Sequence, residues 1–448
     1  MSSYLSASSS SGNRKTWTWS GWTKKSRANG SYNALFTAGN QNFILRFGDA
    51  TNDRIIIYDF NGSTTEYYYA TDAIFRDVSG WYHVVLAYDT TQSTSSDRLK
   101  VWVNGTLQTA LSGSTYPSLN YDGYVNNSLT HYIAHDNAFA GRDFLGVMAH
   151  VHFTDGTAYD ASAFGETDAT TGIWKPKTAP SVTYGTNGFF LKFDNPASMG
   201  ADSSGNANNF TVNGTPTQTV DTPSNVFNTF SPLISSSYQT LSNGNLTTVG
   251  NTATDNGNVY STLAVTKGKY YAEFKYTAGS GYPYVGIGNM EKAGYHGTQN
   301  STTGMVSYSD VSPNVAYNTF GNVFQNGSNI ATYTSLSTND ILGIAIDLDN
   351  GAFYASVNGT FVNSGDPTSG ASKTGAVATW TPADTLYTFG SSNYNGSAVS
   401  ANFGNGYFGT TAVASGNADG NGLGIFEYAP PTGYLALCTK NINSQEYA

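Results

Sequence analysis

The sequence predicts an all-β protein built from two tandem β-sandwiches. Two observations carry this prediction. The 448 residues include 49 Gly, 32 Tyr and 24 Phe, but only 11% are charged, a composition typical of turn-rich sheets rather than of long helices. Short apolar runs with period-2 alternation also recur along the chain, and Asn-Gly or Asp-Gly turns separate them.

The first half of the chain reads as short strands joined by turns. In residues 16–25, Trp17, Trp19 and Gly21 alternate with small polar residues, as expected for a strand with one buried face. Residues 80–110 contain two apolar runs, and the second ends on an Asn-Gly dipeptide at 104–105. Strands of about five to eight residues with such turns predict a sandwich or jelly roll.

The second half repeats this pattern. Residues 339–359 contain two Asn-Gly pairs that punctuate consecutive apolar strands, which predicts a meander within a second sandwich. Residues 200–240 are rich in Ser, Thr, Asn, Gly and Pro and mark a boundary. We therefore predict a jelly roll at 1–215, a linker at 216–240, a second sandwich at 241–410 and a C-terminal extension at 411–448.

Charge and cysteine content exclude several classes of function. The formal net charge is −10, which disfavours nucleic acid as a partner. All seven Arg lie at or before Arg142, whereas residues 230–448 carry 6 basic and 12 acidic groups, which favours two separately folded units. Neither an apolar signal segment nor an 18-residue apolar run occurs, so we expect a soluble protein with no membrane insertion. Cys438 is the only cysteine and is interpreted as a small buried hydrophobe.

Two known sandwich families resemble the two halves. The stretch "WYHVVLAYDTTQSTSSDRLKVWVNG" resembles the central hairpin of laminin-G-like, concanavalin-A-like jelly rolls, and this likeness extends over about residues 1–215. The stretches at 267–276, 284–289, 339–359 and 399–406 resemble SPRY-type sandwiches, in that family's order.

The combination, followed by "FEYAPPTGYLALCTKNIN", is similar to large virion proteins of tailed phages, notably marine phages, described as tail-fibre or lectin-like proteins. This resemblance implies a virion location, other virion proteins as partners, and a homo-oligomer. The leading hypothesis is a non-enzymatic protein that binds a host cell-surface glycan or protein through its loops. The alternatives are a purely structural capsid decoration or fibre subunit, and a polysaccharide depolymerase.

The carboxylate pattern does not favour catalysis. Glycoside hydrolysis requires two carboxyl groups that face one sugar, and none of the six Glu forms the Glu-rich pair of concanavalin-like hydrolases. Glu166 and Asp168 are two residues apart, but they lie in a predicted loop with no adjacent aromatic platform. We therefore expect no enzymatic activity.

Metal binding is a minor hypothesis. His150 and His152 alternate along one strand and could join His83, but we interpret them, like His131 and His135, as hydrogen-bonded sheet residues. Laminin-G-like domains often hold calcium through loop carboxylates, and the resemblance would assign that role to Asp89, Asp97, Asp136 and Asp143. Solvated turn residues are the favoured interpretation, and no other cofactor is expected.

Tyrosine supplies the candidate ligand-binding residues. The strand "EYYYA" at 66–70 places Tyr on both of its faces, so one face must meet solvent or a partner. Further Tyr and one His lie near predicted loops of the second half. Tyr stacks on sugar rings and anchors interfaces, although any one of these residues can also be an ordinary sheet Tyr. The candidates are Tyr67, Tyr69, Tyr282, Tyr284, Tyr295 and His296.

Overall fold

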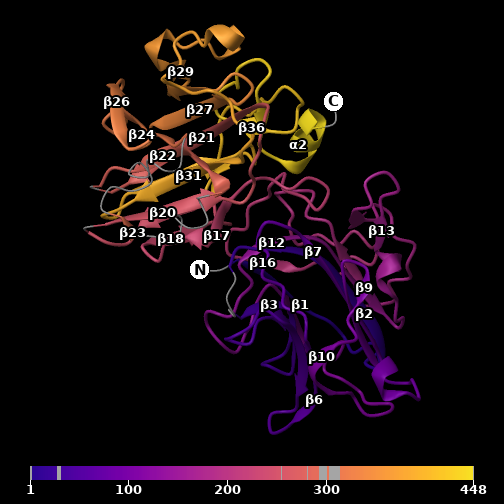
Figure 1. The fold of residues 1–448 in the computed structure, drawn as a ribbon. Helices are drawn as coiled ribbons and strands as arrows, with labels where there is room; N and C mark the ends of the chain where they lie inside the picture. Colours follow the sequence, from indigo (N-terminus) through magenta and orange to yellow (C-terminus); the bar gives the residue numbers. More distant parts are fainter. Residues whose placement is uncertain are drawn as a thin grey trace. The chain divides into compact units, whose positions relative to one another are not determined.

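The protein consists of two all-β units, each a β-sandwich (Figure 1). The computed structural model describes residues 3–27, 32–253, 255–279, 281–291, 300–301 and 313–446. Unit 1 comprises residues 1–218 and unit 2 residues 219–448. This architecture confirms the predicted fold class.

Within its described residues, unit 1 contains an eight-stranded and a six-stranded sheet, and all neighbouring strands in them are antiparallel. The eight-stranded sheet runs β10 (Leu111–Thr115), β6 (Thr65–Thr71), β5 (Ile55–Phe60), β4 (Phe43–Phe47), β3 (Asn33–Ala38), β11 (Thr130–Ile133), β1 (Tyr4–Ser8) and β16 (Thr211–Asn213). The six-stranded sheet runs β15 (Phe189–Leu191), β12 (Gly146–Asp155), β2 (Thr16–Lys25), β7 (Tyr82–Asp89), β8 (Leu99–Val103) and β9 (Thr106–Leu107). Short elements complete the unit: η1 (Ser95–Asp97), η2 (Ala161–Ala163), β13 (Gly165–Thr167) and β14 (Trp174–Pro176).

One buried cluster joins the two sheets of unit 1. It includes Leu45 and Ile57 from the eight-stranded sheet and Trp17 and Trp19 from the six-stranded sheet. Trp17 stacks on Tyr88 of the neighbouring strand β7, with ring centroids 4.8 Å apart. The alternating tryptophans of β2 therefore fill the space between the layers, as period-2 burial requires.

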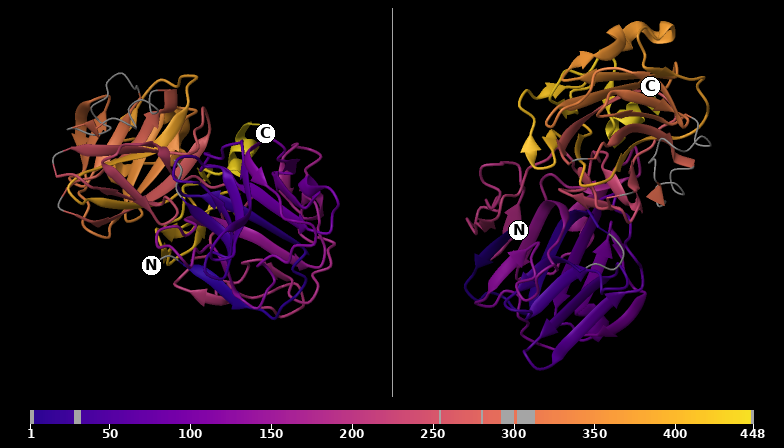
Figure 2. Two further views of the ribbon diagram at one scale, coloured as in Figure 1. Left: turned by 90° about the horizontal axis from the view of Figure 1, so that it is seen from below. Right: turned by 90° about the vertical axis from the view of Figure 1, so that its left-hand side faces the viewer.

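Unit 2 is a second sandwich with a core of its own. Figure 2 shows the strands of both units from two further directions. The first sheet runs β17 (Phe230–Ser235), β20 (Asn256–Ser261), β31 (Tyr387–Asn393), β22 (Tyr284–Asn289), β24 (Val315–Asn318), β25 (Asn322–Gln325) and β26 (Ser328–Thr332), with β23 (Asn300–Ser301) beside β20. The second runs β18 (Gln239–Ser242), β19 (Thr247–Gly250), β32 (Ala398–Asn402), β21 (Lys269–Ala278), β27 (Ile341–Asp347), β28 (Ala352–Val357) and β29 (Thr360–Phe361), with β30 (Ala378–Thr379) beside β28 and β37 (Leu435–Ala436) beside β21. The remaining elements are η4 (Val362–Ser364), η5 (Pro367–Ser372), β33 (Tyr407–Phe408), β34 (Thr411–Ala412), β35 (Asn417–Ala418), β36 (Ile425–Phe426) and α2 (Thr439–Glu446).

Two of the predicted Asn-Gly hairpins form as expected. Asn104 and Gly105 have φ of 48° and 80° between β8 and β9, and Asn358 and Gly359 have φ of 48° and 81° between β28 and β29. Positive φ at both central residues matches the twist of the flanking strands.

The structure corrects two of the predicted boundaries. Residues 230–235, assigned to the linker, form β17, and Phe230 is fully buried in the core of unit 2. The described part of the segment 411–448 is likewise part of that sandwich, because β37 pairs in parallel with β21 and Leu435 and Leu437 join the core. A few large apolar residues in a polar stretch are enough to dock these segments.

The carboxylate of Glu273 holds the C-terminal segment against β21. It is fully buried and accepts hydrogen bonds from the Tyr271 hydroxyl, the Asn402 amide and the backbone N–H groups of Glu427 and Tyr428, over 2.8 to 3.3 Å. Burial outweighs these bonds and raises the pKa of Glu273 to about 7.

No helix in the described part of the chain has the length and apolar character needed to cross a membrane.

We expect the stability of unit 2 to fall as the pH rises through about 7. The folded state holds the Glu273 proton more tightly than the unfolded chain, whose Glu pKa is near 4.5. The stabilisation is therefore complete below about pH 4.5 and is lost above about pH 7, with a size on the order of 3 kcal/mol. Denaturant unfolding of the wild type and of Glu273→Gln at pH 5 and pH 8 measures it. The variant should show a smaller pH dependence, and equal dependence in both proteins would contradict the assignment.

Candidate functional site

Tyr67 and Tyr69, two of the predicted ligand-binding residues, lie in the core instead. They are 0% and 2% exposed and belong to the cluster between the two sheets of unit 1. Tyr68 points to the other face and is 36% exposed. The prediction that Tyr side chains lie on both faces of β6 therefore holds. The outward face carries Tyr68, so the assignment of Tyr67 and Tyr69 as ligand-binding residues was wrong.

The candidate ligand-binding residues of unit 2 differ from one another in exposure. Tyr284 is buried at 7% exposure, whereas Tyr282 is half-buried in the segment that leads into β22. Tyr295 and His296 lie outside the described residues. Tyr282 is thus the predicted residue that the structure places at a surface.

Tyr282 lies in an aromatic patch, defined here as Tyr282, Phe320 and Tyr394. Its ring centroid is 5.0 Å from that of Phe320 and 4.9 Å from that of Tyr394. Phe320 is 57% exposed, although a side chain of this size is normally buried. The buried Tyr284 packs against the patch, with its ring centroid 5.9 Å from that of Tyr282.

A braced turn holds Phe320 outward. The turn between β24 and β25 is closed by the Asn318 side chain, which accepts hydrogen bonds from the backbone N–H groups of Phe320 and Asn322 at 3.0 Å. Gly321 has φ of +81°, and its carbonyl accepts a hydrogen bond from the Tyr333 N–H at 2.8 Å. The exposed ring is therefore fixed by the backbone rather than displayed on a loose loop.

An open cavity of about 490 Å³ adjoins the patch. The described residues that line it include no charged side chain, and the neighbouring hydroxyls and backbone groups favour a neutral, polar ligand. Burial raises the pKa of Tyr394, so its hydroxyl remains a neutral hydrogen-bonding group at physiological pH. The lining residues are Tyr276, Gly281, Tyr282, Thr319, Phe320, Ser335, Leu336, Ser337 and Thr338.

Sequence analysis missed Phe320 and Tyr394. Both lie in turn-like stretches, "YNTFGN" and "SSNYNGS", where a single large aromatic residue stands among Asn, Gly and Ser. An aromatic residue at the apex of such a turn has no strand face into which to pack. That feature could have identified Phe320, but its proximity to Tyr282 depends on the tertiary fold.

The carboxylates considered for catalysis form ion pairs instead. Lys175 contacts Asp168 at 2.7 Å and Glu166 at 3.8 Å on the two-stranded ribbon of β13 and β14. The Lys175 ammonium and the backbone of Thr171 hold the pKa of Asp168 well below its usual range. A carboxylate in this setting is a poor general acid.

Two of the three strand histidines, His83 and His152, have hydrogen-bonding partners, whereas the buried Nδ1 of His150 has none among the described residues. The Nε2 atom of His83 lies 2.8 Å from the Ser20 hydroxyl, and its Nδ1 accepts a hydrogen bond from the Trp174 indole at 2.9 Å. His152 Nδ1 lies 2.9 Å from the Tyr184 hydroxyl. Burial lowers the pKa of His83 to about 3, so this imidazole is neutral at physiological pH.

The four aspartates considered for calcium do not converge on one point. No group of three or more His, Cys, Asp or Glu side chains in the described part of the chain is arranged to hold a metal ion. Asp89 caps its own turn through Thr91 and Gln92, and Asp97 pairs with Lys100 at 2.9 Å. Asp89 and Asp97 therefore act as turn-capping and ion-pairing residues, in line with the favoured interpretation.

His135 and His131 also have partners. His135 Nδ1 lies 2.7 Å from Asp143, and the backbone N–H of Asp136 donates to the same carboxylate oxygen at 3.1 Å. His131 accepts the Asn126 N–H at 3.0 Å. These contacts agree with the interpretation of both histidines as structural residues.

Unit 1 has a cavity of its own, of about 380 Å³, lined by phenylalanines and by side-chain amides. The amides are largely occupied by the protein. Asn126 donates to Asn13 and Asp155, and Asn187 donates to Ser10 and Asn126. Because these amides bond to other protein groups, we interpret the network as structural.

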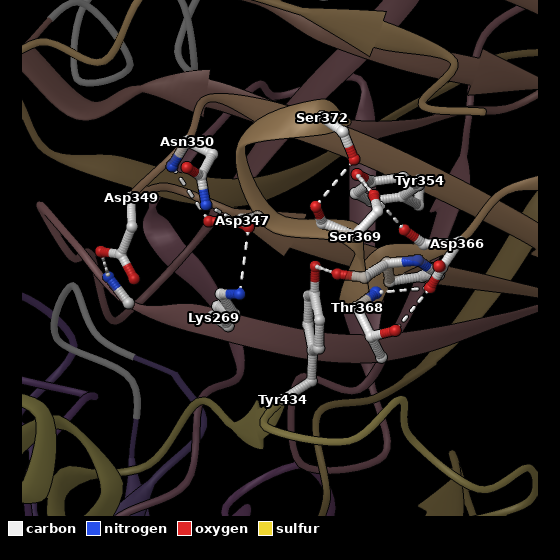
Figure 3. Close-up of polar contacts among 12 residues, drawn as sticks. Lys269, Asp347, Asp349, Asn350, Tyr354, Asp366, Thr368, Ser369, Ser372 and Tyr434 are labelled. Atoms are coloured by element: carbon white, nitrogen blue, oxygen red, sulfur yellow. Dashed lines mark hydrogen bonds and ion pairs between the residues drawn. The ribbon is translucent and has the colours of Figure 1, made fainter. Parts of the chain in front are cut away.

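A polar cluster in unit 2 is held together by contacts within the protein (Figure 3). Lys269 Nζ lies 3.2 Å from the fully buried Asp347, which also accepts hydrogen bonds from the backbone and side chain of Asn350. The Tyr434 hydroxyl donates to the carbonyl of Pro367 at 3.0 Å. These contacts fix the β27–β28 turn and the η5 loop, and we assign the cluster a structural role.

Comparisons with known proteins agree with sandwich architecture. Residues 1–163 match a family model described as the concanavalin A-like lectin/glucanases superfamily. A search of curated proteins gives no match.

Several solved structures are similar to parts of the chain. The SPRY domain of human HERC1 has 17% identity, covering 38% of this chain and 96% of its own, with a TM-score of 0.30. A Bacteroides ovatus protein, described as a candidate carbohydrate binding protein, has 19% identity, with coverages of 48% and 56% and a TM-score of 0.31. A heptameric SAP-like pentraxin from Limulus polyphemus has 15% identity, with coverages of 35% and 71% and a TM-score of 0.27.

We expect Gly321→Ala to destabilise unit 2, whereas Phe320→Ala should be nearly neutral. A Cβ at residue 321 would overlap the carbonyl oxygen of Tyr333, and the backbone there has positive φ, so the cost should be about 1–3 kcal/mol. Thermal unfolding of both variants measures the difference. Equal stability would show that the turn is not rigid.

Proposed function

We propose that this protein is a non-enzymatic glycan-binding protein and that the aromatic patch of unit 2 contacts the sugar. The observation that carries the proposal is the 57% exposure of Phe320 on a braced turn beside an open cavity. An exposed aromatic side chain on a rigid support is typical of a recognition surface. The match of residues 1–163 to the concanavalin A-like lectin/glucanases superfamily supports sugar binding by unit 1.

The chemistry of the patch favours a neutral saccharide. The apolar face of a pyranose ring packs on an aromatic ring, and its hydroxyls need hydrogen-bonding partners around the edge. Tyr282 and Tyr394 contribute hydroxyls beside Phe320, while Ser335 and Ser337 line the cavity. A charged ligand would find no counter-ion among the described lining residues.

We also propose that the protein is displayed on the exterior of a tailed-phage particle and contacts the host surface. Support comes from the sequence resemblance to phage virion proteins. Weak contacts by single copies would then gain strength from multivalent display by a homo-oligomer. Other virion proteins are its proposed neighbours, and binding needs no cofactor.

Single substitutions in the aromatic patch should weaken sugar binding without unfolding the protein. In a glycan array with the full-length chain, Phe320→Ala and Tyr282→Ala should each weaken binding by about tenfold or more, equivalent to roughly 1–3 kcal/mol. Ile330→Ala is the matched control, because Ile330 is 46% exposed on β26 and lies outside the patch. Wild-type binding by the patch variants, or no binding of any host saccharide by the wild type, would contradict the proposal. The latter result would favour a purely structural role.

The virion location has its own test. Antibodies against the chain should label the outside of purified phage particles in electron micrographs. Particles without label would contradict the proposed location. Release of reducing ends from host polysaccharide by the purified chain would instead indicate a depolymerase.

A further inference from the structure

The outer face of the eight-stranded sheet in unit 1 carries a buried arginine with unmatched donors. Leu45 and Phe47 of β4 face the core, so Arg46 between them points to the opposite face. Arg46 is only 9% exposed, and its Nε and Nη1 atoms have no hydrogen-bond partner among the described residues. A buried guanidinium with unmet donors is costly, because it has lost water without gaining acceptors.

A second arginine is stacked above the first. The guanidinium carbon of Arg46 lies 4.3 Å from the ring centroid of Tyr32, and that of Arg142 lies 4.2 Å from the same centroid. Arg142 also lies 3.8 Å from the ring centroid of Phe139, which is 39% exposed. We name Arg46, Tyr32, Arg142 and Phe139 the arginine stack.

The arginine stack is held in place by a third arginine. The Arg27 guanidinium donates hydrogen bonds to the backbone carbonyls of Tyr32, Gly141 and Asp143, over 2.6 to 3.2 Å. The loops that carry Tyr32 and Arg142 are therefore joined to one another. This brace keeps two like charges close together, although they repel.

The charges of the arginine stack are not neutralised by direct ion pairs. Neither Arg46 nor Arg142 has a carboxylate within salt-bridge distance among the described residues. Asp136 exerts an attractive field on Arg46. It is itself 3% exposed, and its Oδ2 atom has no hydrogen bond among those residues. The arginine stack therefore carries positive charge that no described carboxylate neutralises by direct contact.

We propose that the arginine stack binds a carboxylate-bearing saccharide of the hexuronate type. The sugar carboxylate pairs with Arg142, which is half-buried, and the buried Arg46 adds positive charge without direct contact. The sugar ring packs on the exposed Phe139. Guanidinium groups bind carboxylates in a bidentate manner and stack on aromatic rings. This site lies in unit 1 and is separate from the aromatic patch of unit 2.

The test uses trigalacturonate and its fully methyl-esterified form as probes. The two differ at the carboxyl group, which is an anionic carboxylate in the acid and a neutral methyl ester in the other probe. Isothermal titration of the full-length protein should show binding of the acid, at least tenfold weaker binding of the ester, and a loss of affinity as salt is raised. Failure of the acid to bind, or equal binding of both probes, would overturn the proposal.

Variants locate the binding. Arg142→Gln should weaken trigalacturonate binding at least tenfold. Arg76→Gln is the matched control, because Arg76 is exposed and its replacement changes the charge equally outside the stack. Unchanged binding by Arg142→Gln, or an equal loss in both variants, would show that the stack is not the site. Phe320→Ala should bind trigalacturonate like the wild type, so a failure of the glycan proposal for unit 2 is distinguishable from a failure here.

Discussion

Alternation of side chains along each strand is the constraint on which both units depend. A sheet that buries one face against a partner must place every second side chain in the core. In unit 1 this rule sends Trp17 and Trp19 inward and leaves the outer face of the eight-stranded sheet with Arg46 and Tyr68. The same rule thus builds the hydrophobic core and determines which side chains lie on the outer faces of the sheets.

Both proposed binding surfaces depend on hydrogen bonds that hold their loops in place, in addition to the strands. Asn318 closes the turn that presents Phe320, and Arg27 ties together the two loops that carry Tyr32 and Arg142. Holding a loop in one conformation before binding reduces the entropy lost when a ligand arrives. Polar residues that contact no ligand are therefore as important to these surfaces as the aromatic rings.

The fold class could be predicted from the sequence, because alternation and Asn-Gly turns are local properties, as Asn104-Gly105 shows. The candidate site could be predicted only in part. Tyr282 was recognised, but in "EYYYA" all three central residues are Tyr, so composition could not indicate that Tyr68 is the outward one. The aromatic patch joins residues near 282, 320 and 394, and such a grouping follows only from the order of strands in the sheet. Residues 230–235 were misassigned because their neighbours are polar, although Phe230 lies in the core and the segment pairs with β20.

The contacts of Glu273 have a consequence for the order of folding during synthesis. Its partners at residues 427 and 428 lie more than 150 positions later in the chain, and β37 pairs with β21 at residues 435–436. Until these residues leave the ribosome, the carboxylate lacks two of its donors and β21 lacks its parallel neighbour. Unit 1 is fully synthesised by then. Domain-wise folding on the ribosome would therefore complete the N-terminal sandwich before β37 of the C-terminal sandwich is available.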